Sequence, residues 1–378
     1  MTSATANRPT WAEINLENLA FNYHSSREFI GSRTQVMAVV KADAYGHGAA
    51  PCANRLQSEG VDWFGVALLE EGLELRNAGI TKPILLLGGF WPGQENALLE
   101  SSLTPAIFRI ESAEALDYAA AARGITANFH LKIDTGMGRV GVLSRDISDF
   151  AEKLKQFRHL SLEGVMTHFA SADDLNDDFT EHQIEEFHTD VAVLRSKGFA
   201  PKIIDMANSP GAIARPASRG NLVRLGGILY GLGGDVLPAG IEQPVLKPVM
   251  SLHSRIAALK KVPSGTPLGY GRTFTTRNES IIATVPIGYH DGYPRSLSNA
   301  AKVIINGTFC PVVGRISMDW TLADVTNAAN VSVMDEVLLI GESGSHSILA
   351  EDLAGIIGTI SYEITCGIGS RVPRVFIR

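Results

Sequence analysis

The sequence predicts an α/β protein: a (β/α)8 TIM-type barrel followed by a mostly-β C-terminal domain. In the first part of the chain, short apolar, β-branched runs alternate with helical patterns. Eight such units in roughly 200 residues fit a closed barrel better than an open doubly wound sheet. After about residue 240 the helical patterns stop and short strand candidates follow. A length of 378 residues accommodates one large and one smaller domain.

The eight predicted barrel strands are near-continuous apolar runs, which is typical of parallel strands buried on both faces. In chain order they occupy residues 35–41, 62–68, 83–89, 103–108, 127–134, 160–168, 202–208 and 221–227. Helices are expected between them, for example over 69–79, with a glycine at its end, and over 177–198.

Residues 238–244 (PAGIEQP) are expected to join the two domains. The strand candidates beyond this junction lie within 245–262, 280–289, 301–314 and 335–341, separated by Gly, Pro, Asn and Ser. No periodic segment of helical length intervenes until about residue 348, so the second domain is predicted to be mostly β.

Composition excludes several classes of protein. The 33 basic and 40 acidic residues give a net charge of −7, spread along the chain, which argues against nucleic-acid or anionic-membrane partners. The cysteines, Cys52, Cys310 and Cys366, are too widely spaced for a disulfide framework or a zinc motif, and no metal site is predicted. Without a membrane-length apolar run or a secretory pattern at the start, a cytoplasmic location is expected.

Polar residues close several of the predicted barrel strands. Active sites of such barrels form at the C-terminal ends of the strands, so these residues are expected to share one site. They are Lys41, Lys132 with the following Arg139, His168, Asn208 with Ser209, and Arg224 just before Gly226 and Gly227. Each has an ordinary structural interpretation, such as a solvated lysine, a hydrogen-bonded histidine or a tight glycine turn. Their common position at five strand ends favours a functional one.

The chemistry of these residues indicates pyridoxal 5'-phosphate as a cofactor. A lysine desolvated in a barrel mouth has the lowered pKa that Schiff-base formation needs. Ser209 with the glycine amides is typical of a phosphate site after strands seven and eight. The pyridine nitrogen also needs a partner, and Arg224 lies on the right strand.

At this point the sequence resembles the bacterial alanine racemases, which are fold-type-III pyridoxal-phosphate enzymes. The similar segments follow the order of the family along nearly the whole chain: AVVKADAYGHG (38–48), LKIDTGMGRVG (131–141), THFASAD (167–173), ANSPGA (207–212), VRLGGILYG (223–231), LGYGRTF (268–274), PIGYHDGYPR (286–295), GRISMD (314–319) and SYEITCGIGSRVPR (361–374).

The resemblance implies domain boundaries and residue roles. It implies a barrel over residues 13–245 and a β domain over 246–378 that recruits an N-terminal strand at about 10–15. Lys41 would carry the cofactor, and its phosphate would be bound by Tyr45, Ser209, Gly226, Gly227 and Tyr362. Arg224 would face the pyridine nitrogen, with His168 and Asn208 beside it. The substrate side would comprise Arg139, Met318 and Tyr289, with Lys132 often carbamylated in the family and Asp173, Arg295 and Arg315 along the access corridor.

The implied reaction is the interconversion of L- and D-alanine by two bases on opposite faces of the substrate, Lys41 and Tyr270. In the family this tyrosine comes from the other subunit, which implies a homodimer with a shared active site. The product would serve cell-wall peptidoglycan, or the enzyme would degrade D-alanine.

The chain departs from the family pattern at three positions. Asp205 stands where many relatives have histidine, and it could pair with Arg224 instead. Gly227 replaces a bulkier residue, and Arg272 follows the Tyr270 turn where small residues are frequent. A broad-specificity or serine-preferring racemase remains an alternative, because one methyl or hydroxyl changes discrimination only modestly. An alternative from another class is a non-catalytic pyridoxal-phosphate-binding protein. Such proteins are barrels without the β domain, so the presence of residues 246–378 argues against it.

Overall fold

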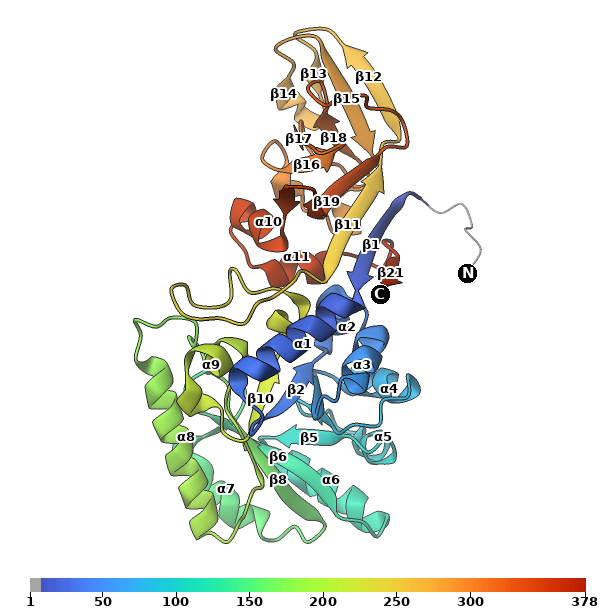
Figure 1. The fold of residues 1–378 in the computed structure, drawn as a ribbon. Coiled ribbons are helices and arrows are strands. Elements are labelled where there is room, and N and C mark those ends of the chain that lie inside the picture. The colour runs from blue at the N-terminus through green and yellow to red at the C-terminus, as the bar shows by residue number, and fades with distance from the viewer. Residues whose placement is uncertain (1–7) are drawn as a thin grey trace.

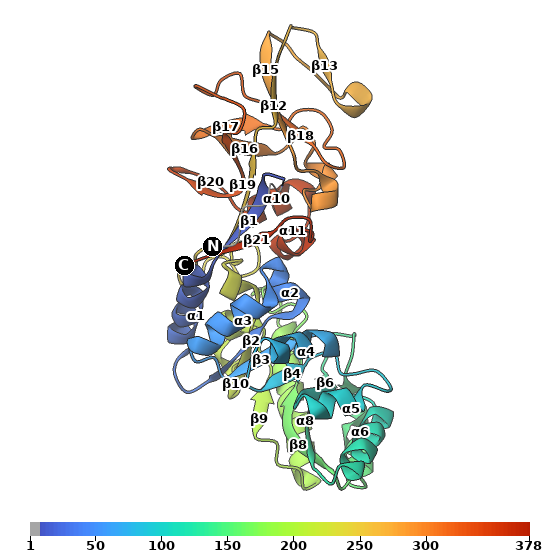
Figure 2. The same ribbon diagram turned by 90° about the vertical axis from the view of Figure 1, so that its right-hand side faces the viewer.

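The computed structural model describes residues 8–378, which form a barrel and a β domain stacked end to end (Figures 1 and 2). The barrel is at the bottom of Figure 1 and the β domain at the top. Strands β1 (Thr10–Asn15) and β21 (Arg374–Ile377), from opposite ends of the chain, lie side by side near the junction and pair in parallel. Within this described part, no helix is both long and apolar enough to cross a bilayer.

Eight parallel strands close the barrel, as predicted. In the order in which they pair around the barrel, these are β5 (Thr104–Ile107), β4 (Ile84–Leu86), β3 (Trp63–Val66), β2 (Gln35–Val39), β10 (Leu222–Leu225), β9 (Ile203–Asp205), β8 (Leu160–Met166) and β6 (Ala127–Asp134). The β5–β6 pairing closes the ring, and the short β7 (Val142–Leu143) adds to β6 outside it. Each strand falls inside one of the apolar runs of the sequence.

Helices cover the outside of the barrel: α1 (Leu16–Ile30), α3 (Ala49–Ser58), α4 (Leu69–Asn77), α5 (Glu95–Glu100), α6 (Ile110–Ala122), α7 (Ile147–Leu154) and α8 (Phe179–Ser196). The short segments α2 (Lys41–Gly46) and α9 (Ser209–Ala214) lie instead at the C-terminal ends of the strands. The helices expected over 69–79 and 177–198 are α4 and α8. Apolar faces of these helices are buried against the sheet, which is the main source of stability for such a layer.

The interior of the barrel has its own apolar cluster, made of Met37, Trp63, Leu85, Ala106, Met166, Ile203 and Leu222. This cluster fills the barrel, so the interior is a packed core rather than a pore. Arg224 lies two positions beyond Leu222 on β10, and Lys132 lies near the C-terminal end of β6. The functional end of the barrel is therefore separated from the opposite rim by a layer of apolar side chains.

The β domain contains two main sheets and two helices. One sheet has the order β17 (Thr308–Pro311), β16 (Lys302–Ile305), β19 (Glu336–Ser343), β11 (Met250–Arg255), β1 and β21, with β20 (His346–Ile348) on β19. The other comprises β12 (Ala258–Val262), β15 (Ser280–Val285) and β18 (Thr321–Asp324), and β13 (Pro267–Leu268) pairs with β14 (Phe274–Thr275). Helices α10 (Ala350–Ile357) and α11 (Ser361–Gly367) begin after the last predicted strand.

Candidate active site

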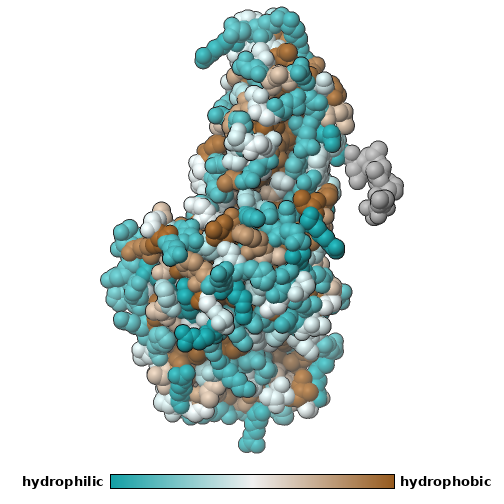
Figure 3. Space-filling view, in the orientation of Figure 1, coloured by the Kyte–Doolittle hydropathy of each residue, from teal (hydrophilic) through white to brown (hydrophobic). Residues whose placement is uncertain are grey.

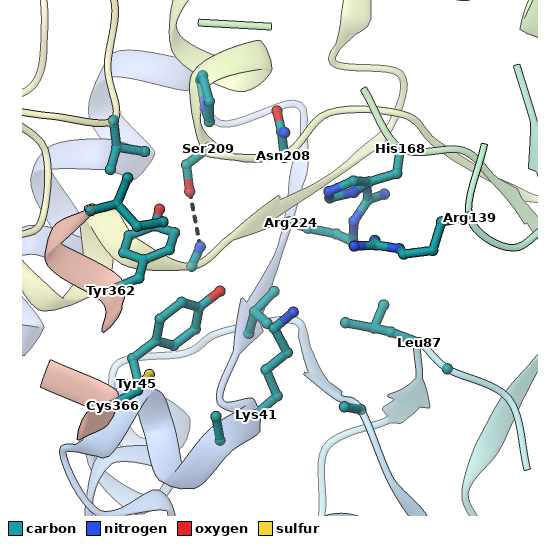
Figure 4. A pocket seen from close by; sticks show the side chains of 18 of the residues that line it. Lys41, Tyr45, Leu87, Arg139, His168, Asn208, Ser209, Arg224, Tyr362 and Cys366 are labelled. Atoms are coloured by element: carbon teal, nitrogen blue, oxygen red, sulfur yellow. Dashed lines mark hydrogen bonds between the residues drawn. The ribbon is translucent and has the colours of Figure 1, made fainter. Parts of the chain in front are cut away.

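A cavity of about 710 Å³ opens at the C-terminal ends of the barrel strands, and α11 of the β domain closes one side of it. Figure 4 shows its lining side chains, with the Lys41 amine pointing inward on the side of Arg224, His168 and Arg139. The cavity brings together ten residues singled out in the sequence: Lys41, Tyr45, Lys132, Arg139, His168, Asn208, Ser209, Arg224, Gly226 and Tyr362. Asp173 also lines it, and Gly227 lies directly beside the Tyr362 ring.

The segment that follows Lys41 is a left-handed helical turn. The four residues from Ala42 to Tyr45 have φ values between +53° and +55°. This conformation costs L-residues roughly 1–2 kcal/mol each, so surrounding contacts must hold it. Glu71 accepts a hydrogen bond from the Ala42 amide at 2.7 Å, and Asp43 accepts one from the Ala49 amide at 2.6 Å. The turn directs Tyr45 into the cavity beside the lysine.

Lys41 occupies a site that disfavours its charged form. Burial holds the pKa of its amine below the usual value, and the positive charges of Arg139 and Arg224 act in the same direction. Glu71 partly opposes this shift. A lysine in such surroundings has a larger fraction of free amine at neutral pH, which is the form that attacks a carbonyl carbon.

Two glycines, a serine and two tyrosines form a cradle at one end of the cavity. The Gly226 amide donates to Ser209 Oγ at 3.0 Å, the bond drawn in Figure 4. A Cβ on Gly226 would lie 2.5 Å from the Tyr45 hydroxyl, and one on Gly227 would lie 2.2 Å from Tyr362 Cε1. In this chain, the absence of a Cβ at both positions leaves the space in which the two phenols approach these backbone amides. The set of hydroxyl and amide donors fits a phosphate group.

A methyl group at Gly227 is predicted to damage this cradle. Gly227→Ala should displace the Tyr362 ring, because the added methyl group would overlap with it. Binding of pyridoxal phosphate should then weaken by about tenfold or more, which corresponds to a loss of about 1.4 kcal/mol or more of binding free energy. The dissociation constant, measured by titrating the cofactor-free protein, checks this.

The matched control for that substitution is Gly355→Ala. Gly355 lies in α10, has an ordinary φ, and has no atom within 4 Å of the position of an added Cβ. Its replacement should leave cofactor affinity unchanged and slightly favour the helix. An unchanged dissociation constant in Gly227→Ala would show that the cradle does not hold the phosphate.

Arg224 connects the cavity to a buried acid. On β10 it forms an ion pair with Asp205 of β9, and both side chains are buried. Its Nη2 atom donates to Nδ1 of His168 at 3.1 Å. Burial and the charge of Arg224 hold the pKa of His168 well below its usual range, so the imidazole is neutral at physiological pH. Asp205 therefore pairs with Arg224 at the position where the chain departs from the family pattern.

Lys132 and Arg139 form a second cationic group across the cavity. Lys132 lies on β6 and donates to the Leu87 carbonyl at 3.2 Å. Burial, together with the charges of Arg224 and Arg139, lowers the pKa of the Lys132 amine to about 8. Asp134 accepts from the amides of Gly136 and Gly138, both at 3.0 Å, and so folds the loop that carries Arg139 back toward the cavity.

The predicted residues of the β domain lie elsewhere on the chain surface, apart from Tyr362. Tyr270, Met318 and Tyr289 do not line the cavity, and their exposed fractions are 72%, 51% and 42%. Tyr270 stands at the tip of a turn between Gly269 and Gly271, whose φ values are +68° and +70°. A Cβ on Gly271 would contact the guanidinium of Arg315 at 3.2 Å, so this turn packs against that corridor residue.

Three residues at or near the cavity, Glu71, Asp235 and Cys366, have no role that could be predicted from the sequence. Glu71 holds the left-handed turn, and Asp235 accepts hydrogen bonds from the Ser361 amide at 2.6 Å and its hydroxyl at 2.8 Å, which fixes the start of α11. Cys366 also lines the cavity from α11. Asp235 and Cys366 reach the cavity because α11 packs against the barrel. That packing is a tertiary contact, and no local pattern in the sequence indicates it.

Two protein-family models match the chain. "Alanine racemase, N-terminal domain" covers residues 14–233 and "Alanine racemase, C-terminal domain" covers residues 249–376. The chain belongs to the alanine racemase family. Alanine racemase from Geobacter sulfurreducens is 45% identical over 376 residues, which is 98% of this chain and 97% of that protein. The chain is thus an enzyme of the isomerase class that acts on an amino acid.

Solved structures of the family agree with the fold. Alanine racemase from Bacillus anthracis with bound L-Ala-P superposes with a TM-score of 0.93 at 37% identity, over 99% of this chain and 96% of that one. Alanine racemase from Bartonella henselae with covalently bound pyridoxal phosphate gives a TM-score of 0.88 at 30% identity, over 98% of this chain and 99% of that one.

Proposed function

We propose that the protein interconverts L- and D-alanine with pyridoxal 5'-phosphate, using Lys41 and Tyr270 as the two bases. The observation that carries this proposal is the desolvated Lys41 amine in one cavity with a phosphate cradle. Relatives named with covalently bound pyridoxal phosphate and with bound L-Ala-P support the choice of cofactor and substrate. In the cytoplasm this reaction would provide D-alanine for peptidoglycan or begin its degradation.

The residues around the cavity divide the binding of the cofactor between them. Ser209, the amides of Gly226 and Gly227, and the hydroxyls of Tyr45 and Tyr362 are the proposed phosphate ligands. At the other end of the cavity, Arg224 would face the pyridine nitrogen and Lys41 would be the point of covalent attachment. Asn208 holds the loop, since its Oδ1 accepts from the Gly211 amide at 3.1 Å. When bound, pyridoxal phosphate withdraws electrons from the α-carbon of the amino acid and so makes the α-proton acidic.

Proton transfer is proposed to occur on opposite faces of the substrate. Lys41 removes or returns the α-proton on one face, and Tyr270 does so on the other, so the substrate need not turn over. Neutral His168 would hydrogen-bond the Tyr270 phenol, and Arg139 would bind the substrate carboxylate by a charge-assisted bond. Tyr289 and Met318 would shape the same side of the pocket.

The exposure of Tyr270 supports the proposal that this side chain contacts a second copy of the chain. Tyr270, Met318, Tyr289 and Trp320 are exposed large apolar side chains of the β domain. Figure 3 shows brown apolar areas on the β domain, at its junction with the barrel and on the barrel itself, among mostly hydrophilic surroundings. A homodimer that inserts this turn into the neighbouring barrel would complete each site with residues from both subunits.

Carbamylation of Lys132 is a further part of the proposal. The reaction with carbon dioxide needs the free amine, and a pKa of about 8 makes that form accessible at neutral pH. The resulting anion would lie beside Arg139 and orient its guanidinium. Protein prepared with 13C-labelled bicarbonate is expected to show one enriched carbonyl resonance that is absent from Lys132→Ala. Identical spectra of the two proteins would contradict this assignment.

The activity itself is tested by D-amino-acid formation from a panel of L-amino acids. Alanine is expected to react fastest, with serine the most informative competitor because it differs by one hydroxyl. Failure of the wild-type protein to racemise alanine would overturn the proposed reaction. Faster turnover of serine would support the broad-specificity or serine-preferring alternative.

A further inference from the structure

The ion pair between Asp205 and Arg224 lies immediately behind the cavity. Asp205 is fully buried at the end of β9, and Arg224 is only 3% exposed on β10. Oδ1 of Asp205 accepts from Arg224 Nη1. Within residues 8–378, Oδ2 of the same carboxylate has no hydrogen-bond partner. A buried carboxylate with one unsatisfied oxygen contributes little to the stability of the fold. A contribution to stability therefore does not explain why an acid lies at this position.

The other end of the guanidinium determines which nitrogen of His168 carries a proton. Arg224 Nη2 donates to the carbonyls of Thr167 at 2.9 Å and Met206 at 3.1 Å, and to His168 Nδ1 at 3.1 Å. A guanidinium has only donors and does not release its protons, so Nδ1 must be an acceptor. The neutral imidazole then carries its hydrogen on Nε2.

Arg224 needs an anion to remain in this orientation. The cavity also contains the guanidinium of Arg139, whose positive charge repels that of Arg224. Nη2 has two hydrogens for three acceptors, so those bonds alone leave several orientations open. The carboxylate of Asp205 holds the opposite nitrogen and compensates the charge, which restricts the guanidinium to one orientation.

We propose that Asp205 is a positioning residue that clamps Arg224 so that the guanidinium keeps donating to His168 Nδ1 and leaves His168 Nε2–H as a donor. The consequence for catalysis rests on the proposed function, because His168 would present Nε2–H to the Tyr270 phenol. The tautomer of His168 follows from the geometry of this chain alone. It can therefore be measured whether or not the protein racemises alanine.

The test is 15N NMR of the full-length protein as purified with its cofactor, labelled at histidine, with the His168 signals assigned from a His168→Gln variant. The wild type is expected to show neutral His168 with Nε2 protonated. Asp205→Asn preserves the shape and one acceptor oxygen but removes the charge, whereas Asp205→Ala also removes the acceptor. Both variants should populate the Nδ1-protonated tautomer or the imidazolium, Asp205→Ala more than Asp205→Asn.

The direction of the change in the pKa of His168 separates positioning from a simple effect of charge. The charged groups facing His168 are Arg224, Lys132, Arg139 and Lys41, and all of them lower its pKa. If Arg224 moves away in Asp205→Asn, the pKa should rise by about one unit or more. If Arg224 stays and only the carboxylate charge is lost, the pKa falls further. A fall, or an unchanged tautomer and titration in Asp205→Asn, overturns the proposal.

Asp190→Asn is the matched control. Asp190 is another buried carboxylate of the barrel domain, 3% exposed on α8, and it accepts from Ser144 Oγ at 2.7 Å away from the cavity. The Asp190→Asn substitution should lower the stability of the protein without changing the NMR signals of His168. If Asp205→Ala does not fold, Asp205→Asn decides the question alone. Loss of alanine racemisation by tenfold or more in Asp205→Asn, but not in Asp190→Asn, would extend the proposal to catalysis, while an inactive wild type would contradict only the proposed function.

Discussion

Replacing Lys41 by alanine is expected to reduce kcat/KM for alanine racemisation at least about a thousandfold, since it removes both the covalent attachment and one of the two bases. Burial lowers the pKa of its amine, so a larger fraction of the amine is in the free, nucleophilic form at neutral pH. After borohydride reduction and denaturation, the wild-type chain should retain the mass of the cofactor, and Lys41→Ala should not. Activity is measured as D-alanine formed from L-alanine.

Lys202→Ala provides the control for this substitution. Lys202 is exposed and precedes β9 at the opposite end of the barrel, so its loss should change neither cofactor retention nor turnover. Cofactor trapped covalently in Lys41→Ala, or racemisation by that variant at the wild-type rate, would show that another group forms the attachment.

Tyr270→Phe is expected to lower racemisation by about a hundredfold or more while leaving cofactor binding intact, because general acid–base catalysis typically contributes factors of this size. Proton exchange at the α-carbon in D₂O should continue from one enantiomer, through Lys41, and be lost from the other. Tyr118→Phe is the control, since Tyr118 is 79% exposed on α6 and lies outside the cavity. Equal loss of exchange from both enantiomers would contradict a two-base mechanism.

The same substitution tests which chain contributes Tyr270. Lys41→Ala and Tyr270→Phe chains, co-expressed with different affinity tags, yield a hybrid dimer that can be purified through both tags. If Tyr270 acts in the neighbouring subunit, one of the two sites in the hybrid contains both native residues, and activity should recover to about half that of the wild-type dimer. A hybrid as inactive as its parents would indicate that each site uses residues of one chain only, or that no dimer forms.

Much of the barrel could be predicted from the sequence because a parallel strand buried on both faces must be apolar along its length. Polar residues that close such a run therefore indicate the end of the strand, and the C-terminal ends share one rim. Lys41, His168 and Arg224 could be placed at this rim from the sequence, and the cavity contains all three. The mostly-β character of the second domain followed from its turn residues in the same way.

The left-handed turn after Lys41 could not be predicted. Alanine prefers the right-handed helix, and nothing local in Ala42–Tyr45 indicates a positive φ. The turn depends on Glu71, which is 29 residues away, and on the close approach of Gly46 to the Thr365 carbonyl of α11. The resemblance implied that an N-terminal strand joins the β domain, but the order of the strands in that domain had no local signal, for example the position of β11 between β1 and β19.

By itself, then, the sequence determined where the strands lie, which strand ends carry reactive side chains, and which family's motifs the chain contains. These properties are local, because they depend on the burial and chemistry of neighbouring residues. Only the tertiary structure decided that α11 closes the cavity and that Asp205 pairs with Arg224. Those outcomes depend on contacts between segments far apart in the chain. Such segments meet only in the folded protein, where the fit of their side chains and charges decides which contacts form.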